Sequence, residues 1–368
     1  MELEEQHGSG TNAVERFAVS VVMRHGGDSE AAPHRWSEDD LSEIHAIERN
    51  TVLLAALAGA ISGALIGMVE VLYRGRLDLA QIARYWQAWT VFLVVAVVVS
   101  AVEIGLLYWL VLRRASRVAS IAGLGLSRRE RETVIALGVS RASLEMPNPR
   151  TSIYGIDPYA SVPRWQLLAY TALYRLKIGV TSFVLRIVLR RLLARATLRV
   201  FIPLISVPVY AAWNAVVIRW VMREVRIRAA GPRAIEEIRE WIAESERSLD
   251  AEARGLIVQA VAECITRARD AHPNFVLLLD RLLRDLELTT DRFELDWSDA
   301  RRRIAELDET TQRLVLRVTI GTAVLSGRIR RRQHELLAEL HELCGASYTK
   351  DEVGALRESF MRGQGLPA

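Results

Sequence analysis

Two long apolar stretches, close together in the sequence, constrain the fold of this chain more than any other feature. Thr51–Val69 carries no charged side chain, and Trp89–Leu112 is apolar apart from Glu103. Because a helix rises 1.5 Å per residue, each stretch can cross a hydrocarbon core of about 30 Å. The sequence therefore predicts an all-α membrane protein with a transmembrane hairpin, whose spans are residues 52–73 and 89–112.

The residues that flank the two spans predict their orientation. Aromatic side chains lie near the span ends, as is typical of a membrane interface: Tyr73, Tyr85, Trp86, Trp89 and Trp109. Three arginines lie between the spans, whereas six lie between residues 113 and 131. The positive-inside rule then places the N-terminus in the cytoplasm of a bacterial inner membrane.

The segments on either side of the hairpin are polar. Residues 1–50 are acidic and contain no cleavable signal peptide, so the first span must itself direct insertion. Residues 113–176 predict a cytosolic helical connector and a proline-rich loop with the sequences Pro147-Asn-Pro149 and Gly155-Ile-Asp-Pro158. Such a loop resists helix formation and is expected to pack as an irregular strap.

Residues 177–230 predict a second membrane element. Its first half is an amphipathic helix whose arginines are expected to contact lipid phosphates: Arg186, Arg190, Arg191, Arg195 and Arg199. An uncharged run, Val200–Ile218, follows and contains Pro203, Pro208 and Asn214. This run either crosses the membrane or forms a kinked re-entrant segment. We favour an apolar hairpin, with spans three and four, that returns the chain to the cytoplasm.

The C-terminal part of the chain, residues 231–368, predicts a soluble helical bundle. Gly231-Pro232 is expected to close the membrane region, and frequent charge pairs at a spacing of four follow it. The predicted helices are residues 235–247, 251–269, 274–287, 297–305, 309–325, 330–344 and 350–361.

Gly59, Gly63 and Gly67 are spaced four residues apart in the first span, which places them on one helix face. Such a face allows the backbone of a second helix to approach closely. It indicates either packing of the first span on the second or a glycine zipper that joins several copies of the chain.

Glu103 is the acidic residue within the second span, where a charged carboxylate is costly. It indicates either a proton or cation handle or a neutral packing residue that needs a hydrogen-bond partner. A serine, an arginine or water would serve as that partner.

No catalytic motif, cofactor site or metal site emerges from the sequence. His334, His341 and Cys344 share one predicted helix, but the zinc-protease spacing is absent because Ala338 occupies the second histidine position. A solvated or packed helix face is therefore favoured over a metal enzyme. A net charge of +4, without a basic tract outside the membrane flanks, argues against nucleic-acid binding.

Two segments resemble known families. Leu325-Ser-Gly-Arg-Ile329, Gln333 and the helix that ends at Cys344 resemble the TerB-like helical domain of bacterial tellurite-resistance proteins. The sequence departs from that pattern at Ser326 and Gln333, where the family has acidic residues, so the resemblance implies the helix-turn-helix shape and leaves metal binding open. Residues 186–226 resemble the apolar hairpin of the EcsC family. The whole arrangement is similar to an uncharacterised bacterial membrane-protein family, which would imply architecture but no activity.

These patterns together predict a non-enzymatic membrane anchor or scaffold in an envelope or stress response. Residues 231–368 would bind a protein partner in the cytosol, and the C-terminus would be cytoplasmic. The alternative is a channel or transporter component, a homo-oligomer built on the glycine face with Glu103 in its pathway.

Overall fold

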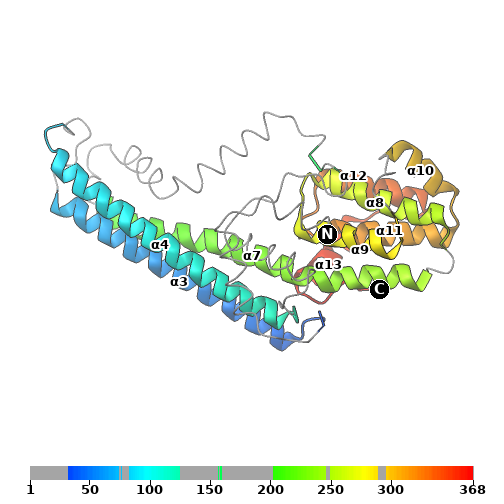
Figure 1. Ribbon diagram of the computed structural model, residues 1–368, viewed down its shortest axis with the longest axis horizontal. Coiled ribbons are helices and arrows are strands. Elements are labelled where there is room, and N and C mark those ends of the chain that lie inside the picture. Colours follow the sequence, from blue (N-terminus) through cyan, green and yellow to red (C-terminus); the bar gives the residue numbers. More distant parts are fainter. Residues whose placement is uncertain are drawn as a thin grey trace. The chain divides into compact units, whose positions relative to one another are not determined.

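The described part of the chain is entirely α-helical. The computed structural model describes residues 32–73, 76, 83–124, 156, 158–159, 202–245, 249–288 and 296–367. Within these ranges it contains nine helices and no β-strand (Figure 1). The helices are α3 (Glu38–Leu72), α4 (Trp86–Ile121), α7 (Ile202–Ser245), α8 (Ala251–Ala268), α9 (Pro273–Asp285), α10 (Trp297–Glu306), α11 (Glu309–Val324), α12 (Arg331–Leu343) and α13 (Lys350–Met361). The prediction of an all-α fold is confirmed for these residues.

The chain divides into two compact units. The hairpin unit consists of Ile44–Ala115 and Arg164–Arg223, and the domain unit consists of Met1–Glu43, Ser116–Pro163 and Glu224–Ala368. Helices α3, α4 and α7 each contribute residues to both units.

In the hairpin unit, α3 and α4 pack side by side along an apolar seam (Figure 1). Ile66 of α3 is buried against Trp89, Phe92 and Ala96 of α4. Trp89 and Phe92 meet edge to face at a centroid distance of 6.0 Å, the arrangement that aromatic quadrupoles favour. This seam joins the end of α3 to the start of α4, as an antiparallel hairpin requires.

Both helices of the hairpin are longer than the spans predicted from the sequence. Helix α3 begins at Glu38, within the segment expected to be merely polar, because Ser37 and Asp40 form a capping box there. Its first turn is acidic, which suits the positive end of the helix dipole. Helix α4 continues from Trp86 to Ile121. The first predicted span therefore forms the C-terminal part of α3, and the second forms most of α4, which continues for nine residues beyond it.

The domain unit is built around α8, which packs against α9, α10, α11 and α12. Its buried residues cover most of the helix circumference, as expected of a helix near the centre of a bundle, and one stripe through Gly255, Gln259 and Glu263 is half-buried. Each of the predicted helices from 251 onward is present, with ends that differ by at most two residues. Carboxylates cap three of these helices at their first turn: Asp250, Asp296 and Asp308.

The expected end of the membrane region at Gly231-Pro232 is wrong as a helix boundary. Helix α7 passes through both residues without interruption. Pro232 lacks the N–H that would bond to the carbonyl of Arg228, but it is buried, as are Ala230 and Gly231, so tertiary packing keeps the helix intact. Gly231 is needed because a Cβ there would lie 2.3 Å from Oδ1 of Asn274. Residues 202–218, for which a kinked re-entrant segment was one alternative, form the first part of this same helix.

Candidate functional site

The hairpin unit contains a polar junction at which its three helices meet. The Asn214 side chain of α7 donates one hydrogen bond to Glu103 Oε1 of α4, at 2.6 Å. It donates another to the backbone carbonyl of Ala55 in α3, at 3.3 Å. Both N–H groups of the amide are thus used, and Glu103, which is only 7% exposed, has a partner. We call Glu103, Asn214, Ala55 and Gly59 the polar junction.

Gly59 is what allows α7 to come so close to α3. A Cβ at this position would lie 2.6 Å from the carbonyl oxygen of Tyr210 and 2.8 Å from Nδ2 of Asn214. Backbone therefore touches backbone at Gly59, as small residues permit in apolar helix pairs. Gly63 and Gly67 are also buried on α3. At Gly59 the glycine face is used within one chain, and its partner is α7 rather than the second span.

The polar junction lies deep along the apolar part of each helix. Gly59 follows Arg49 by ten residues and Glu103 precedes Arg113 by ten, or about 15 Å in both cases at 1.5 Å per residue. Glu103 and Gly59 are therefore at the same depth in the antiparallel hairpin. The Asn214 amide gives the buried carboxyl group of Glu103 a hydrogen-bond donor without placing a second charge beside it.

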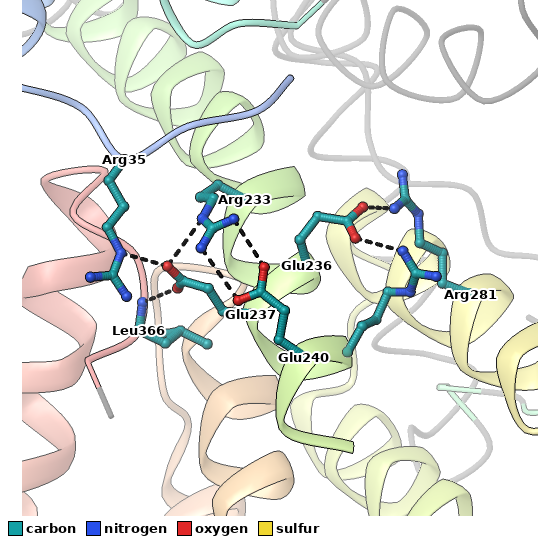
Figure 2. A network of polar contacts seen from close by, with 8 residues as sticks. Arg35, Arg233, Glu236, Glu237, Glu240, Arg281 and Leu366 are labelled. Carbon is teal, nitrogen blue, oxygen red and sulfur yellow. Dashed lines mark hydrogen bonds and ion pairs between the residues drawn. The ribbon is translucent and has the colours of Figure 1, made fainter. Parts of the chain in front are cut away.

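The domain unit contains a second polar cluster, which is centred on Glu237 of α7. This carboxylate is only 2% exposed and accepts three hydrogen bonds (Figure 2). The donors are Nε of Arg35 at 2.7 Å, Nε of Arg233 at 3.1 Å and the backbone N–H of Leu366 at 2.5 Å. Glu237 thus binds the segment before α3 and the segment after α13 at one point.

A neighbouring carboxylate, Glu236, connects α7 to α9. It pairs with Arg239 on its own helix and with Arg281 of α9 (Figure 2). Arg239 in turn forms two bonds to Asp285, at 2.5 and 2.9 Å. Paired guanidinium and carboxylate groups of this kind fix orientation as well as distance.

A histidine and a carboxylate pair where α9 begins. His272 caps α9 by accepting the backbone N–H of Asn274 at Nδ1, so Nε2 carries the proton that faces Glu224, 3.1 Å away. Burial by itself raises the pKa of Glu224, but His272 and Arg228 outweigh it and hold that pKa far below its usual value. These groups fix the start of α9 on α7, since Asn274 also bonds to the Ile227 carbonyl.

His334, His341 and Cys344 do not converge on a common centre. His334 bonds to the hydroxyl of Tyr348, whereas Nδ1 of His341 donates to the carbonyl of Leu337 at 2.6 Å. Burial raises the pKa of the Cys344 thiol. Among the residues that the structure describes, no three His, Cys, Asp or Glu side chains are grouped as metal ligands.

The turn with the TerB-like pattern is held by neutral groups. Ser326 donates to the carbonyl of Arg328 at 2.8 Å, and Oε1 of Gln333 accepts the Arg330 N–H at 2.9 Å. The amide of Gln333 also donates to the Cys264 carbonyl at 3.4 Å, which an ionised carboxylate could not do. Gln333 therefore ties the start of α12 to α8.

The remaining predicted site residues cannot be placed. Arg186, Arg190, Arg191, Arg195 and Arg199 lie outside the described residues, as does most of the proline-rich loop. Of that loop, Ile156 and Pro158 are described and buried. Tyr159 accepts the Ala271 N–H at 3.4 Å, as a packed strap would.

Comparisons with protein-family models, curated proteins and solved structures gave no match. The resemblances to TerB-like and EcsC proteins remain predictions from the sequence.

Proposed function

We propose that this protein is a non-enzymatic membrane anchor that presents a helical domain to a protein partner. The distribution of exposed apolar side chains carries the proposal. Large exposed hydrophobic residues lie on α3, on α4 and in α7 before residue 221. In the described residues of the domain unit, no large hydrophobic side chain is exposed. A water-soluble chain rarely exposes one continuous apolar surface of this kind, whereas lipid requires it.

Helices α3 and α4 are the two helices of the described chain that are long and apolar enough to cross a membrane. Only 33% and 22% of the residues in their most apolar windows are buried, which argues against core helices of a soluble fold. Trp86 and Trp109 are 23 positions apart on α4, or about 35 Å, slightly more than a hydrocarbon core.

Interfacial side chains support the same boundaries. The Arg84 guanidinium lies 5.6 Å from the Tyr85 ring centroid, and that of Arg113 lies 5.5 Å from the Trp109 ring. Such pairs place a cation and an amphipathic ring at the headgroup level. We take α7 up to about Arg219 as the returning helix of the second apolar hairpin, whose first span falls outside the described residues; the domain unit and the N-terminus are then both in the cytoplasm.

A matched pair of arginine substitutions on α4 tests insertion. Val97 is 66% exposed midway between Trp86 and Trp109, whereas Gln87 is exposed near the start of the helix. In lipid, Val97→Arg costs about 3 kcal/mol and Gln87→Arg costs much less. In a soluble protein both surface changes would be nearly neutral.

The measurement is the fraction of chain that stays in the membrane pellet after alkaline carbonate washing. The Val97→Arg variant is expected to leave the membrane pellet, whereas the Gln87→Arg variant is expected to stay in it. If the native chain itself washes off, the anchor proposal fails. Cytoplasm-active and periplasm-active reporters fused after Ala368 then report the side of the domain unit.

The alternative function is proton or cation passage. The observation that favours it is a carboxyl group buried between three apolar helices, at Glu103. Ion flux into liposomes that falls with Glu103→Gln, at unchanged expression, would support passage. Equal flux would leave Glu103 with a packing role.

A further inference from the structure

The last described residues of the chain form a non-helical segment that packs on the domain unit. Helix α13 ends at Met361, and residues 362–367 follow without helical structure. We call residues 362–367 the tail. Two backbone contacts fix its course: the Trp36 N–H donates to the Gly363 carbonyl at 2.9 Å, and Ser359 Oγ donates to the Gly365 carbonyl at 3.1 Å.

The two glycines of the tail lie against two different side chains, Trp36 and Glu237. Gly363 lies under the Trp36 ring, where a Cβ would be 2.0 Å from ring carbons. Gly365 lies against the Glu237 carboxylate, where a Cβ would be 2.3 Å from Oε1. Both glycines also have positive φ, a conformation that side chains disfavour. A glycine is therefore required at both positions, for space and for backbone geometry.

The leucine after the second glycine fills an apolar hole. Leu366 is 1% exposed, and its N–H bonds to Glu237 at 2.5 Å. A Cβ on Gly321 of α11 would lie 3.3 Å from Leu366 Cδ1 and 3.1 Å from Ile238 of α7. The missing side chain at Gly321 thus leaves the space that the leucine occupies.

The tail is held by few groups compared with the helices beneath it. One leucine side chain and a few hydrogen bonds must offset the entropy lost when a non-helical segment with two glycines becomes ordered, and glycine has the most backbone freedom to lose. By contrast, three of the residues that the tail contacts, Glu237, Ile238 and Gly321, belong to α7 and α11 and are buried. Segments with few buried contacts open locally while the core stays folded.

We propose that the tail is a reversible latch, and that the seat it occupies is a peptide-binding site. The seat consists of Trp36, Glu237, Ile238 and Gly321. Its ligand is a non-helical segment with glycines two positions apart followed by leucine, held by a backbone N–H on the Glu237 carboxylate. A partner with such a segment displaces the chain's own tail and takes its place against Trp36 and Glu237.

This proposal goes beyond the anchor function and does not depend on it, because every contact lies within the domain unit. Failure of membrane insertion would leave it untouched. It can be tested on the full chain in detergent.

Amide hydrogen exchange is the first test, since it needs no variant. If the tail opens locally, the Leu366 amide exchanges at least about tenfold faster than that of Ile257 in α8, and its rate is insensitive to low denaturant. Equal rates with the same denaturant dependence would mean that the tail leaves only when the domain unfolds, which overturns the latch.

Binding of a labelled peptide with the sequence of residues 357–367 is the second test. A chain truncated after Arg362 should bind it, and the intact chain should bind at least about tenfold more weakly because its own tail competes. A Gly365→Ala peptide should lose binding, whereas a Gln364→Ala peptide should keep it, because Gln364 is exposed. Equal binding to both chains, or equal binding of both altered peptides, refutes the site.

Discussion

Replacing Gly59 by alanine should separate α7 from α3 and destabilise the hairpin unit. The added methyl group would lie 2.6 Å from the Tyr210 carbonyl oxygen, so α7 must retreat by the better part of an ångström. That retreat lengthens the bond from Asn214 to Ala55, which is already 3.3 Å. Overpacking costs about 1–3 kcal/mol, and a lost interhelical hydrogen bond costs about 0.6 kcal/mol more in a membrane protein.

Gly105→Ala is the matched control. It is a glycine on the neighbouring apolar helix, and a Cβ there would meet nothing within 4 Å. In a helix, alanine is more stable than glycine by up to about 1 kcal/mol. This gain offsets part of the packing penalty of Gly59→Ala, whereas at Gly105 no packing penalty accompanies it. The two variants should therefore differ by about 2 kcal/mol, with Gly59→Ala the less stable.

Unfolding in detergent micelles, followed against the mole fraction of SDS, measures this difference. A gap of about 1.4 kcal/mol corresponds to a tenfold change in the unfolding equilibrium constant, so the expected gap is easily resolved. If the two variants unfold together, α7 does not touch α3 at Gly59, and the polar junction is refuted with it.

Three further predictions concern the domain unit. Gln333→Glu should destabilise it by about 1–3 kcal/mol in urea, because a carboxylate cannot donate to the Cys264 carbonyl; an unchanged midpoint would contradict that bond. Burial raises the pKa of the Cys264 thiol to about 12, so a thiol reagent should label Cys344 first and Cys264 only on unfolding. Although burial opposes it, Arg267 lowers the pKa of Glu339. The stability that this pair provides is present above about pH 4.3 and is lost as the pH falls below it, so Glu339→Gln should flatten the acid limb of a pH titration of stability.

Much of the helical pattern could be predicted because it is encoded locally. The starts at Asp250, Asp296 and Asp308 each need only a carboxylate and the backbone of the next turn. The helix end predicted at Gly231-Pro232 was wrong because tertiary packing overrides the local preference of these residues to end a helix. The packing partner of Gly231 is Asn274, which is 43 positions away in the sequence.

The candidate sites were predictable only in part. Glu103 and Gly59 stand out because a carboxyl and a periodic glycine are unusual in an apolar helix, but Asn214 reaches Glu103 across 111 positions of sequence and Ala55, beside Gly59, across 159. The sequence shows the uncharged run that contains Asn214, but it does not show that Asn214 pairs with Glu103. Nothing in the sequence distinguishes Glu237, because Arg233 and Glu237 have the spacing of an ordinary ion pair on a helix surface.

The contact between Glu103 and Asn214 also bears on how such a protein could evolve. Asparagine and aspartate codons differ by a single nucleotide, and aspartate has nearly the same shape. That one change would set two carboxyl groups at a distance of about 2.6 Å, where like charges cannot both persist and a single proton is shared between them. A helix bundle that only needs to hold together is thus one mutation away from a bundle that holds a shared proton at its centre.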